Sequence, residues 1–272
     1  MRTIKKGFLW IAAIAILLTG NGISATAQKL TSFEKKGKYG FKDETGKVVI
    51  EAKYKYVKQF SEDLAAVQFK DKWGYIDKTG MEVIPFEYVD ASPFSEGKAR
   101  VQYSVIERFG YIDTKGMKVL PFEFGSPGDF HNGFTTEAAL VDFVLKFGFI
   151  NDMGVMVIQP TYDQVTYENG LWKVKLDDKY GFLDSVLNLA VPIEYNVSYG
   201  FKNGYAAVNI GGAYNQYYSV EGGKWGFIDK TGKVIVPVQY DDVESFNAEG
   251  IAKVTLNGEK FSINTKGERV QN

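Results

Sequence analysis

The sequence has no cysteine, and among its 272 residues it has a single histidine, His131. Without cysteine there is no disulfide framework, no thiolate zinc site, no cysteine nucleophile and no cysteine for lipid attachment. A metal site would have to be built mostly from carboxylates, which are not the donor set that zinc prefers. The chain must therefore hold itself together by its apolar core and its backbone hydrogen bonds. Its length is sufficient, because chains of this size bury about 70–75% of their unfolded surface.

A long hydrophobic run is also missing. The longest, Phe8–Leu18, has eleven residues, which is short of the roughly 20 that a membrane span needs. This run follows three basic residues and precedes the small-residue stretch Ala25–Ala27. The pattern predicts a secretory signal peptide over residues 1–27, cleaved before Gln28; an uncleaved N-terminal anchor is the alternative. We expect an exported protein, periplasmic or secreted, with no permanent membrane anchor.

The chain has no strong excess of charge of either sign. Of its 32 basic and 33 acidic residues, three basic and no acidic ones lie in the first 27 positions. The remaining residues carry 29 basic against 33 acidic groups, a net charge of about −4. This mild acidity disfavours nucleic acid and an anionic membrane surface as partners.

What the sequence does contain is a short motif that occurs seven times. The motif is an aromatic residue, glycine, a second aromatic residue, a position that is usually aliphatic, and Asp or Asn. Successive copies are 34, 36, 38, 33, 45 and 35 residues apart, a spacing typical of tandem supersecondary repeats. The copies are Tyr39–Asp43, Trp73–Asp77, Phe109–Asp113, Phe147–Asn151, Tyr180–Asp184, Trp225–Asp229 and, in a decayed form, Lys260–Asn264.

A turn is predicted directly after each copy of the motif. In six copies the Asp or Asn begins a four-residue turn that ends in glycine, as from Asp77 to Gly80, which is typical of a type I turn that closes a hairpin. In the remaining copy Asp184 leads to Asn188 or its neighbours, and we expect an asparagine to adopt the conformation of the glycine there. The acids of the motif are therefore interpreted first as turn residues.

The residues after the turn predict strands. An aliphatic stretch reaches a proline in five copies, as in Val83–Pro85, and we expect the proline to mark the end of strand pairing. Two further aromatic positions follow, then glycine and an alternation of small and apolar residues, as in Gly97–Val101, which is typical of a strand. No helical periodicity of useful length is present. The predicted fold is all-β, built from tandem antiparallel β-hairpins whose aromatic residues form a stacked core.

The two ends of the chain bear on whether the repeats close into a ring. The first and last copies of the motif are in phase, which leaves six repeats and a terminal half repeat in a single domain over residues 28–272. This arrangement favours an open, curved, solenoid-like array with atypical repeats at its ends. A six- or seven-bladed β-propeller is the alternative, because the period and the strand content resemble those of propeller blades.

Two copies of the motif carry a family resemblance. Lys72–Gly80, KWGYIDKTG, and Lys224–Gly232, KWGFIDKTG, resemble the core of the bacterial WG repeat, also called the KWG repeat. The resemblance covers about residues 33 to 270 and is weaker where Phe109, Phe147 and Tyr180 replace the tryptophan. It implies an array of β-hairpins that serves as an interaction or binding module, and it supplies no catalytic residues to transfer.

No set of residues points to catalysis. His131 lies in the irregular segment Gly125–Gly133, and no strained Gly-x-Ser-x-Gly turn is available to present a serine nucleophile. Glu87, Glu123 and Glu194 recur with the repeat, as a solvated structural column does, and none has the distinct setting of a glycosidase acid. The acidic pairs lack the spacing of a calcium loop, and the glycines form no nucleotide-binding fingerprint. We predict no catalytic, cofactor-binding or metal-binding residue, and no enzyme.

The sixth repeat is interrupted by extra residues. Val208 and Trp225 are 17 positions apart, against six for the same step in three other repeats, so about eleven residues are inserted. Tyrosine mixed with glycine, asparagine and serine is typical of recognition loops, and insertions in repeat proteins often map to the binding face. A long hairpin tip without a partner is the alternative. A milder irregularity runs over Thr135–Lys146. The predicted binding loop consists of Tyr214, Asn215, Gln216, Tyr217 and Tyr218.

Taken together, these features favour an exported, non-catalytic binding module that recognises a protein, a peptide or a cell-envelope glycan, without a cofactor and without nucleic acid. A carbohydrate-active hydrolase that uses two acids on a β scaffold is one alternative. A purely structural spacer is the other.

Overall fold

The computed structural model describes residues 29–270, so the predicted signal peptide, residues 1–27, lies outside the described residues. The described chain forms seven antiparallel sheets and no helix, and hence no helix with the length and apolarity of a membrane span. We number the sheets 1 to 7 along the chain. Sheet 1 is β1 (Thr31–Lys35), β2 (Lys38–Lys42) and β3 (Val48–Tyr54); sheet 2 is β4 (Tyr56–Val57), β5 (Ala65–Phe69), β6 (Lys72–Ile76) and β7 (Glu82–Tyr88); sheet 3 is β8 (Asp90–Ala91), β9 (Ala99–Gln102), β10 (Phe109–Ile112) and β11 (Lys118–Phe124); sheet 4 is β12 (Phe134–Val141), β13 (Val144–Asn151) and β14 (Met156–Tyr162); sheet 5 is β15 (Gln164–Glu168), β16 (Leu171–Leu176), β17 (Lys179–Leu183) and β18 (Leu189–Tyr195); sheet 6 is β19 (Val197–Lys202), β20 (Tyr205–Tyr214), β21 (Val220–Asp229) and β22 (Val234–Tyr240); sheet 7 is β23 (Asp242–Val243), β24 (Ile251–Leu256), β25 (Glu259–Asn264) and β26 (Arg269–Val270).

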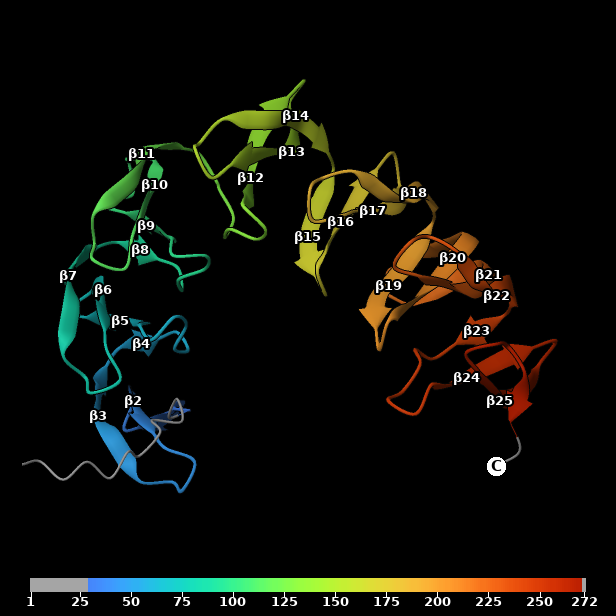
Figure 1. Cartoon of the computed structure of the whole chain (residues 1–272), viewed down its shortest axis with the longest axis horizontal. Helices are drawn as coiled ribbons and strands as arrows, with labels where there is room; N and C mark the ends of the chain where they lie inside the picture. Colours follow the sequence, from blue (N-terminus) through green and yellow to red (C-terminus); the bar gives the residue numbers. More distant parts are fainter. Residues whose placement is uncertain (1–28, 271–272) are drawn as a thin grey trace, which may run out of the picture.

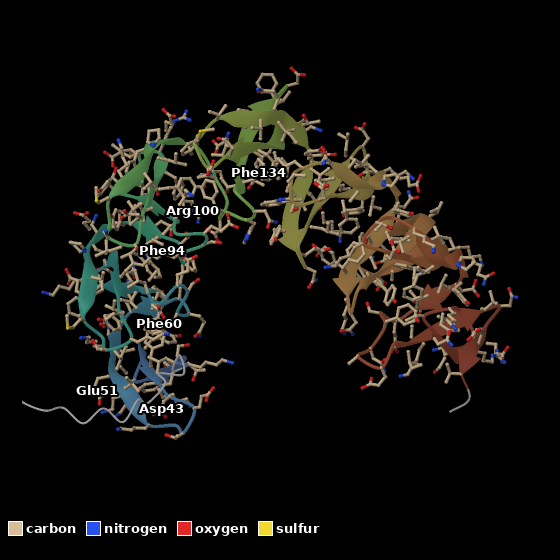
Figure 2. The ribbon with its side chains drawn as sticks, in the orientation of Figure 1. Asp43, Glu51, Phe60, Phe94, Arg100 and Phe134 are labelled. Carbon is tan, nitrogen blue, oxygen red and sulfur yellow. The ribbon has the colours of Figure 1, made fainter. Side chains whose placement is uncertain are left out.

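The sheets follow one another along an open arc (Figure 1). Within each sheet the strands pair in chain order, each antiparallel to the one before it. In sheets 2 to 6 the first strand faces the inside of the arc and the last strand faces the outside, while sheets 1 and 7 form its two separate ends (Figure 1; Figure 2 shows the same arc with its side chains). No strand of sheet 1 pairs with a strand of sheet 7 within residues 29–270. The predicted open, curved array of antiparallel β-hairpins is therefore the observed fold, with single sheets that resemble propeller blades.

The predicted turn chemistry is confirmed at the motif acids. Asp77 Oδ1 accepts the backbone N–H groups of Thr79 and Met81, and the N–H of Gly80 donates to the carbonyl of Asp77. Gly80 takes the positive φ that the turn requires. In the copy without glycine, however, Leu187 occupies the left-handed position with φ 66°, so the expected asparagine is not the residue that adopts it.

The expectation that proline ends the last strand of each repeat is wrong. Strand β7 continues past Pro85 to Tyr88, and the corresponding strands of sheets 3 to 6 also continue past their prolines. This is possible because each of these is the outermost strand of its sheet. A proline nitrogen that faces away from the neighbouring strand removes no ladder hydrogen bond.

Each interior sheet buries both of its faces. In sheet 2, Val67 and Ile76 pack towards sheet 1, while Tyr75 and Tyr88 pack towards sheet 3. The motif glycine between these aromatic positions lets the last strand approach closely, because a Cβ on Gly74 would lie 2.7 Å from the carbonyl oxygen of Ile84. The repeating aromatic and glycine columns thus belong to the stacked core, as predicted.

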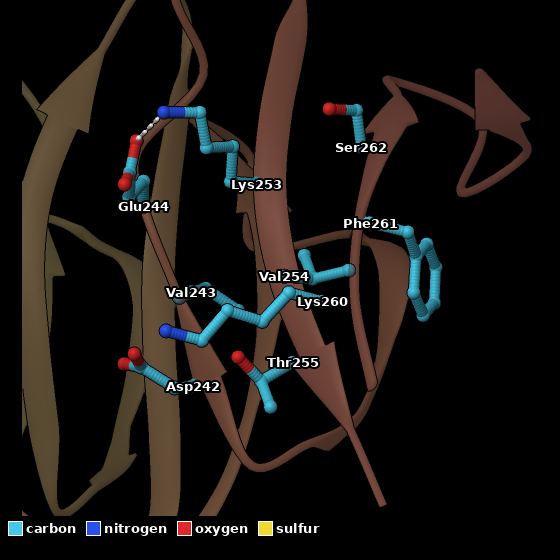
Figure 3. A pocket seen from close by; sticks show the side chains of 9 residues that line it. All are labelled: Asp242, Val243, Glu244, Lys253, Val254, Thr255, Lys260, Phe261 and Ser262. Atoms are coloured by element: carbon cyan, nitrogen blue, oxygen red, sulfur yellow. Dashed lines mark ion pairs between the residues drawn. The ribbon is translucent and has the colours of Figure 1, made fainter. Parts of the chain in front are cut away.

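The two terminal sheets carry polar groups where the interior sheets carry apolar ones. In sheet 1, Lys42 takes the register position of Ile76. In sheet 7, Lys253 and Ser262 take the paired positions that Ala66 and Tyr75 occupy in sheet 2. Figure 3 shows this outer face of sheet 7, where Lys253 Nζ lies 3.7 Å from a carboxylate oxygen of Glu244. Both ends are therefore caps of the kind that keep repeat proteins soluble.

Sheet 4 lacks a regular inner strand. The segment before it runs irregularly and makes two isolated bridges to β12, between Pro127 and Glu137 and between His131 and Phe134. Glu137 takes the position of a buried valine such as Val101, and its Oε1 accepts the N–H of Gly125 at 2.7 Å. The Glu137 carboxylate replaces part of the missing strand pairing. The irregular segment Gly125–Gly133 therefore stands where the other sheets have an inner strand.

Candidate functional site

The hairpins that lead into the aromatic-glycine strands lie along one edge of the array, and we call them the motif hairpins. The connections between successive sheets lie along the same edge, which we call the motif rim. Contacts between the two types of segment place them together: Lys55, in the connection after sheet 1, pairs with Asp71, at the motif hairpin of sheet 2, at 2.6 Å. In the same way Asp163, in the connection after sheet 4, accepts the N–H of Asp177 in the motif hairpin of sheet 5.

Most motif hairpins have tight two-residue turns, whereas the motif hairpin of sheet 6 is much longer. Strands β20 and β21 have ten residues each, and their pairing extends from Tyr205 to Tyr214. The insertion noted in the sequence therefore lengthens a hairpin on the motif rim. The mild irregularity at 135–146 lengthens the motif hairpin of sheet 4 on the same rim.

The long hairpin is held by a buried asparagine at its base. Asn209 is fully buried, its Oδ1 accepts the N–H of Gly212 at 2.8 Å, and its Nδ2 donates to the carbonyl of Gly222 at 3.3 Å. A Cβ on Gly223 would fall on Asn209 Oδ1 and on the nitrogen of Gly212, so no side chain fits there. Gly211 donates its N–H to Asn196 Oδ1, in the connection after sheet 5, at 2.8 Å. The base of the hairpin is thus fixed on both sides.

The tip of the hairpin repeats the turn chemistry of the motif. Asn215 Oδ1 accepts the N–H groups of Tyr217 and Ser219, as a motif acid does in its own turn. Tyr218 occupies the position where most motif turns have glycine, with φ 60°. Phe143 and Leu187 adopt the same conformation at other turns, with φ 65° and 66°, so it reflects the geometry of the turn. Tyr217 is 76% and Tyr218 88% exposed, so neither contributes to the core.

A cavity of about 330 Å³ lies between the motif hairpins of sheets 5 and 6. Tyr214, at the end of β20, and Tyr180, at the start of β17, both line it. Burial raises the pKa of Tyr214, and the nearby phenols of Tyr180 and Tyr199 act in the same direction. The remaining lining residues are Lys175, Asp178, Asn196, Gly212 and Ala213.

The charged groups of this cavity are already paired. Lys175 Nζ lies 2.8 Å from Asp178 Oδ1, and Lys179 Nζ donates to Asn196 Oδ1 at 2.8 Å. The Asp178 contact raises the pKa of Lys175. The cavity is consequently lined by aromatic groups, neutral polar groups and one lysine–aspartate pair whose charges cancel.

The structure brings together some of the predicted site residues and separates others. Tyr214 lines the cavity, whereas Asn215 closes the tip and Gln216, Tyr217 and Tyr218 point to solvent at the turn. Their role in binding stays a prediction. The sequence analysis did not identify Tyr180 or Asn209, because both occupy ordinary repeat positions; the glycine pairs that flank the insertion were the available signal for a clamped hairpin.

The residues weighed for catalysis do not assemble. His131 stacks on Tyr167 with ring centroids 4.1 Å apart and a 6° angle between planes, and its burial lowers its pKa. Glu87, Glu123 and Glu194 are exposed, one on the outer strand of each of three sheets. Within residues 29–270 no group of three His, Asp or Glu side chains could hold a metal ion.

The outer face of sheet 7 forms another hollow, of about 250 Å³, around Lys253 and Ser262 (Figure 3). It lies on the capping face, where an interior sheet would be covered by its neighbour. Polar side chains are expected on a face that ends the array and meets solvent, so we assign this hollow no ligand.

The fold and the rim define a class of protein: an open array of small antiparallel sheets of the propeller-blade type, with one elongated hairpin on the rim. The chain belongs to the family of the WG containing repeat, whose sequence profile matches residues 39–73, 73–104, 109–136, 147–180, 180–214 and 225–259. Each matched repeat is offset from the sheets, since 73–104 contains β6 and β7 of sheet 2 and β8 and β9 of sheet 3. The offset ties neighbouring sheets together within one sequence repeat.

Solved structures resemble the chain in fold. A eukaryotic initiation factor gives a TM-score of 0.53 at 11% identity, with 88% of this chain and 72% of that chain covered. Apo AztD from Citrobacter koseri gives 0.38 at 13% identity, covering 89% and 77%, and the Neurospora crassa Pan2 WD40 domain gives 0.31 at 10%, covering 76% and 74%. The similarity to the initiation factor is one of fold alone. No curated protein matches the chain by sequence.

Proposed function

We propose that this protein is an exported, non-catalytic binding module that holds its ligand at the motif rim of sheets 5 and 6. The observation that supports this most directly is the construction of the β20–β21 hairpin. A buried asparagine and glycines that admit no Cβ fix its base, and Tyr217 and Tyr218 are exposed at its tip. A hairpin with a fixed base presents these side chains in a defined position.

The exposed tyrosines supply a recognition surface of a familiar kind. Tyrosine provides a large, rigid, amphipathic contact area at a low cost in side-chain entropy. Tyr214, Tyr217 and Tyr218 are all at least 45% exposed and lie within five residues of one another. The ligand on this proposal is a protein, a peptide or a cell-envelope glycan.

The test compares capture from an envelope extract by three forms of residues 28–272. These are the unchanged chain, a variant with Tyr214, Tyr217 and Tyr218 replaced by alanine, and the control Tyr56→Ala. Tyr56 is 52% exposed but lies in β4, on the inner side of sheet 2. We expect capture to be lost in the triple variant and kept in the control, with equal melting temperatures. Unchanged capture by the triple variant would contradict the proposal, and so would a parallel loss of stability and capture.

Export is a separate part of the proposal and rests on the sequence of residues 1–27. A chain expressed with its full N-terminus is expected to be recovered outside the cytoplasm and to begin at Gln28. Recovery of the intact chain in the cytoplasmic fraction would contradict it.

A further inference from the structure

We infer that the cavity between the motif hairpins of sheets 5 and 6 binds a neutral sugar ring of a glycan. This inference rests on the proposed function and gives its ligand a chemical class. It follows from the aromatic walls of the cavity, from the pairing of its charges and from the rigidity of the hairpin that closes it.

Two tyrosines form aromatic walls of the cavity. Tyr214 and Tyr180 come from the motif hairpins of neighbouring sheets, and both line the same cavity. The amino groups of Lys173 and Lys175 lie over the Tyr180 ring, 5.0 and 5.7 Å from its centroid, so Tyr214, which is 45% exposed, offers the more open ring. Tyr199 lies close enough to Tyr214 to influence its pKa, and it is itself packed on Trp225 with ring centroids 4.4 Å apart. Tyrosine offers an apolar face together with a hydroxyl that donates and accepts hydrogen bonds. A pyranose has the matching combination of a C–H face and a rim of hydroxyl groups.

The charges of the lining favour a neutral ligand. The charged side chains that line the cavity are Lys175 and Asp178, whose charged atoms lie 2.8 Å apart. A phosphate or carboxylate would meet the carboxylate of Asp178, and a cation would meet the ammonium group of Lys175. Because the two charges cancel, the lining offers no net opposite charge to an ion of either sign. A neutral ligand leaves this pair in place.

The polar groups exclude a purely apolar ligand. Lys175, Asp178 and Asn196 line the cavity alongside the tyrosines, and an apolar ligand would cover them without replacing their hydrogen bonds to water. The volume of about 330 Å³ is at the small end of the range for ligand sites, about 300–1,000 Å³. It suits one or two rings better than an extended peptide segment, which usually binds along a free strand edge.

The hairpin is fixed before the ligand arrives. Asn209 and Asn196 hold its base from sheet 6 and from the connection after sheet 5. The wall that carries Tyr214 therefore needs little ordering on binding, which favours affinity for a small ligand.

The experiment titrates the chain, residues 28–272, with neutral oligosaccharides of glucose, galactose and N-acetylglucosamine, and with a neutral Ala-Gly hexapeptide, by calorimetry. Ligands are taken to about 10 mM, because millimolar dissociation constants are measurable there. We expect saturable binding of at least one saccharide and none of the hexapeptide. Binding of the peptide alone, or of no ligand, would overturn the inference.

Two variants locate the site. Ala213 is exposed and lines the cavity, so Ala213→Trp should fill it without removing a core contact and weaken saccharide binding at least about tenfold. Tyr180→Phe should retain the fold and weaken binding by a smaller factor through the lost hydroxyl. Saccharide binding that Ala213→Trp leaves unchanged would overturn the inference. The capture experiment with Tyr214, Tyr217 and Tyr218 detects any ligand of an envelope extract, whereas these titrations detect saccharides alone. Capture from the extract without saccharide binding would therefore overturn this inference and leave the proposed function standing.

Discussion

The Oδ1 atom of Asn209 accepts the backbone N–H of Gly212 at 2.8 Å, inside the base of the β20–β21 hairpin. The same side chain donates to the carbonyl of Gly222 on the opposite strand. A single amide therefore joins both strands at the point where three glycines take positive φ. These two hydrogen bonds fix the base of the β20–β21 hairpin, which we call the arm.

Replacing Asn209 by alanine should loosen the arm. The change removes both side-chain contacts and leaves the Gly212 N–H without its partner, at a cost of about 1–3 kcal/mol in unfolding free energy. Hydrogen exchange should increase in β20 and β21 beyond Asn209 and remain unchanged in sheets 1 to 3. The control is Asn151→Asp, which keeps an oxygen acceptor in the motif turn of sheet 4 and should leave protection of β20 and β21 unchanged. Equal protection of the arm in Asn209→Ala and the unchanged chain would contradict this role.

Replacing Tyr218 by glycine should separate stability from binding. Glycine tolerates the left-handed conformation, so Tyr218→Gly is expected to raise the unfolding free energy by up to about 1 kcal/mol. If Tyr218 contacts the ligand, the same variant binds it more weakly. Denaturant unfolding and ligand capture measure the two effects. The control Lys36→Gly, at an exposed position of sheet 1 with φ 53°, should gain stability with no effect on capture. A loss of stability in Tyr218→Gly would show that the ring is needed for packing.

Restoring interior residues at the two caps should cause end-to-end association. Lys42→Ile places an apolar residue on the outer face of sheet 1, and Lys253→Ala with Ser262→Tyr does the same on sheet 7. The combined variant is expected to form larger species in light scattering, because each end then resembles an uncovered interior face. Changes at one end alone should have a smaller effect. A monomeric combined variant would show that the lysines are not what prevents stacking.

The turn aspartates should make stability depend on pH in the acid range. The hydroxyl of Thr79 and the N–H groups of the turn hold the pKa of Asp77 below its ordinary value of 3.8. Because the folded pKa is lowered, this contribution is present above about pH 4 and is lost as the pH falls through the folded value. Asp229 has the same setting, with Thr231 as the leading cause of its lowered pKa.

Asn151 is an uncharged counterpart of these aspartates within the chain. Its Oδ1 accepts the backbone N–H groups of Met153 and Val155, at the turn positions that correspond to Thr79 and Met81. The double variant Asp77→Asn, Asp229→Asn should therefore keep its turns and lose less stability between about pH 5 and pH 2 than the unchanged chain. Thermal unfolding over this range is the measurement. Identical pH profiles would contradict a role for these carboxylates.

Local patterns along the chain were sufficient to predict the strands, the turns and the repeat. Asp, Asn and glycine at fixed offsets specify a turn through backbone conformation and short hydrogen bonds, which involve only neighbouring residues. The exceptions are instructive. Proline did not end β7, because the position of that strand at the edge of its sheet depends on the order of the strands in space. Leu187 takes a conformation for which asparagine was expected, because the hairpin on either side of it imposes that conformation.

The insertion in the sixth repeat and its tyrosines were visible in the sequence, but their arrangement was not. Asn209 and Tyr180 occupy repeat positions that look ordinary until the hairpins of neighbouring sheets are brought together. The cavity has walls from β16–β17 and β20–β21 and from the connection at Asn196, segments joined only by sheet stacking. The sequence by itself thus determined the repeating hairpins and their turns, whose interactions are local. Only the tertiary structure decided that the array stays open, that its ends are capped and that Tyr214 meets Tyr180, because each depends on the packing of one sheet against the next.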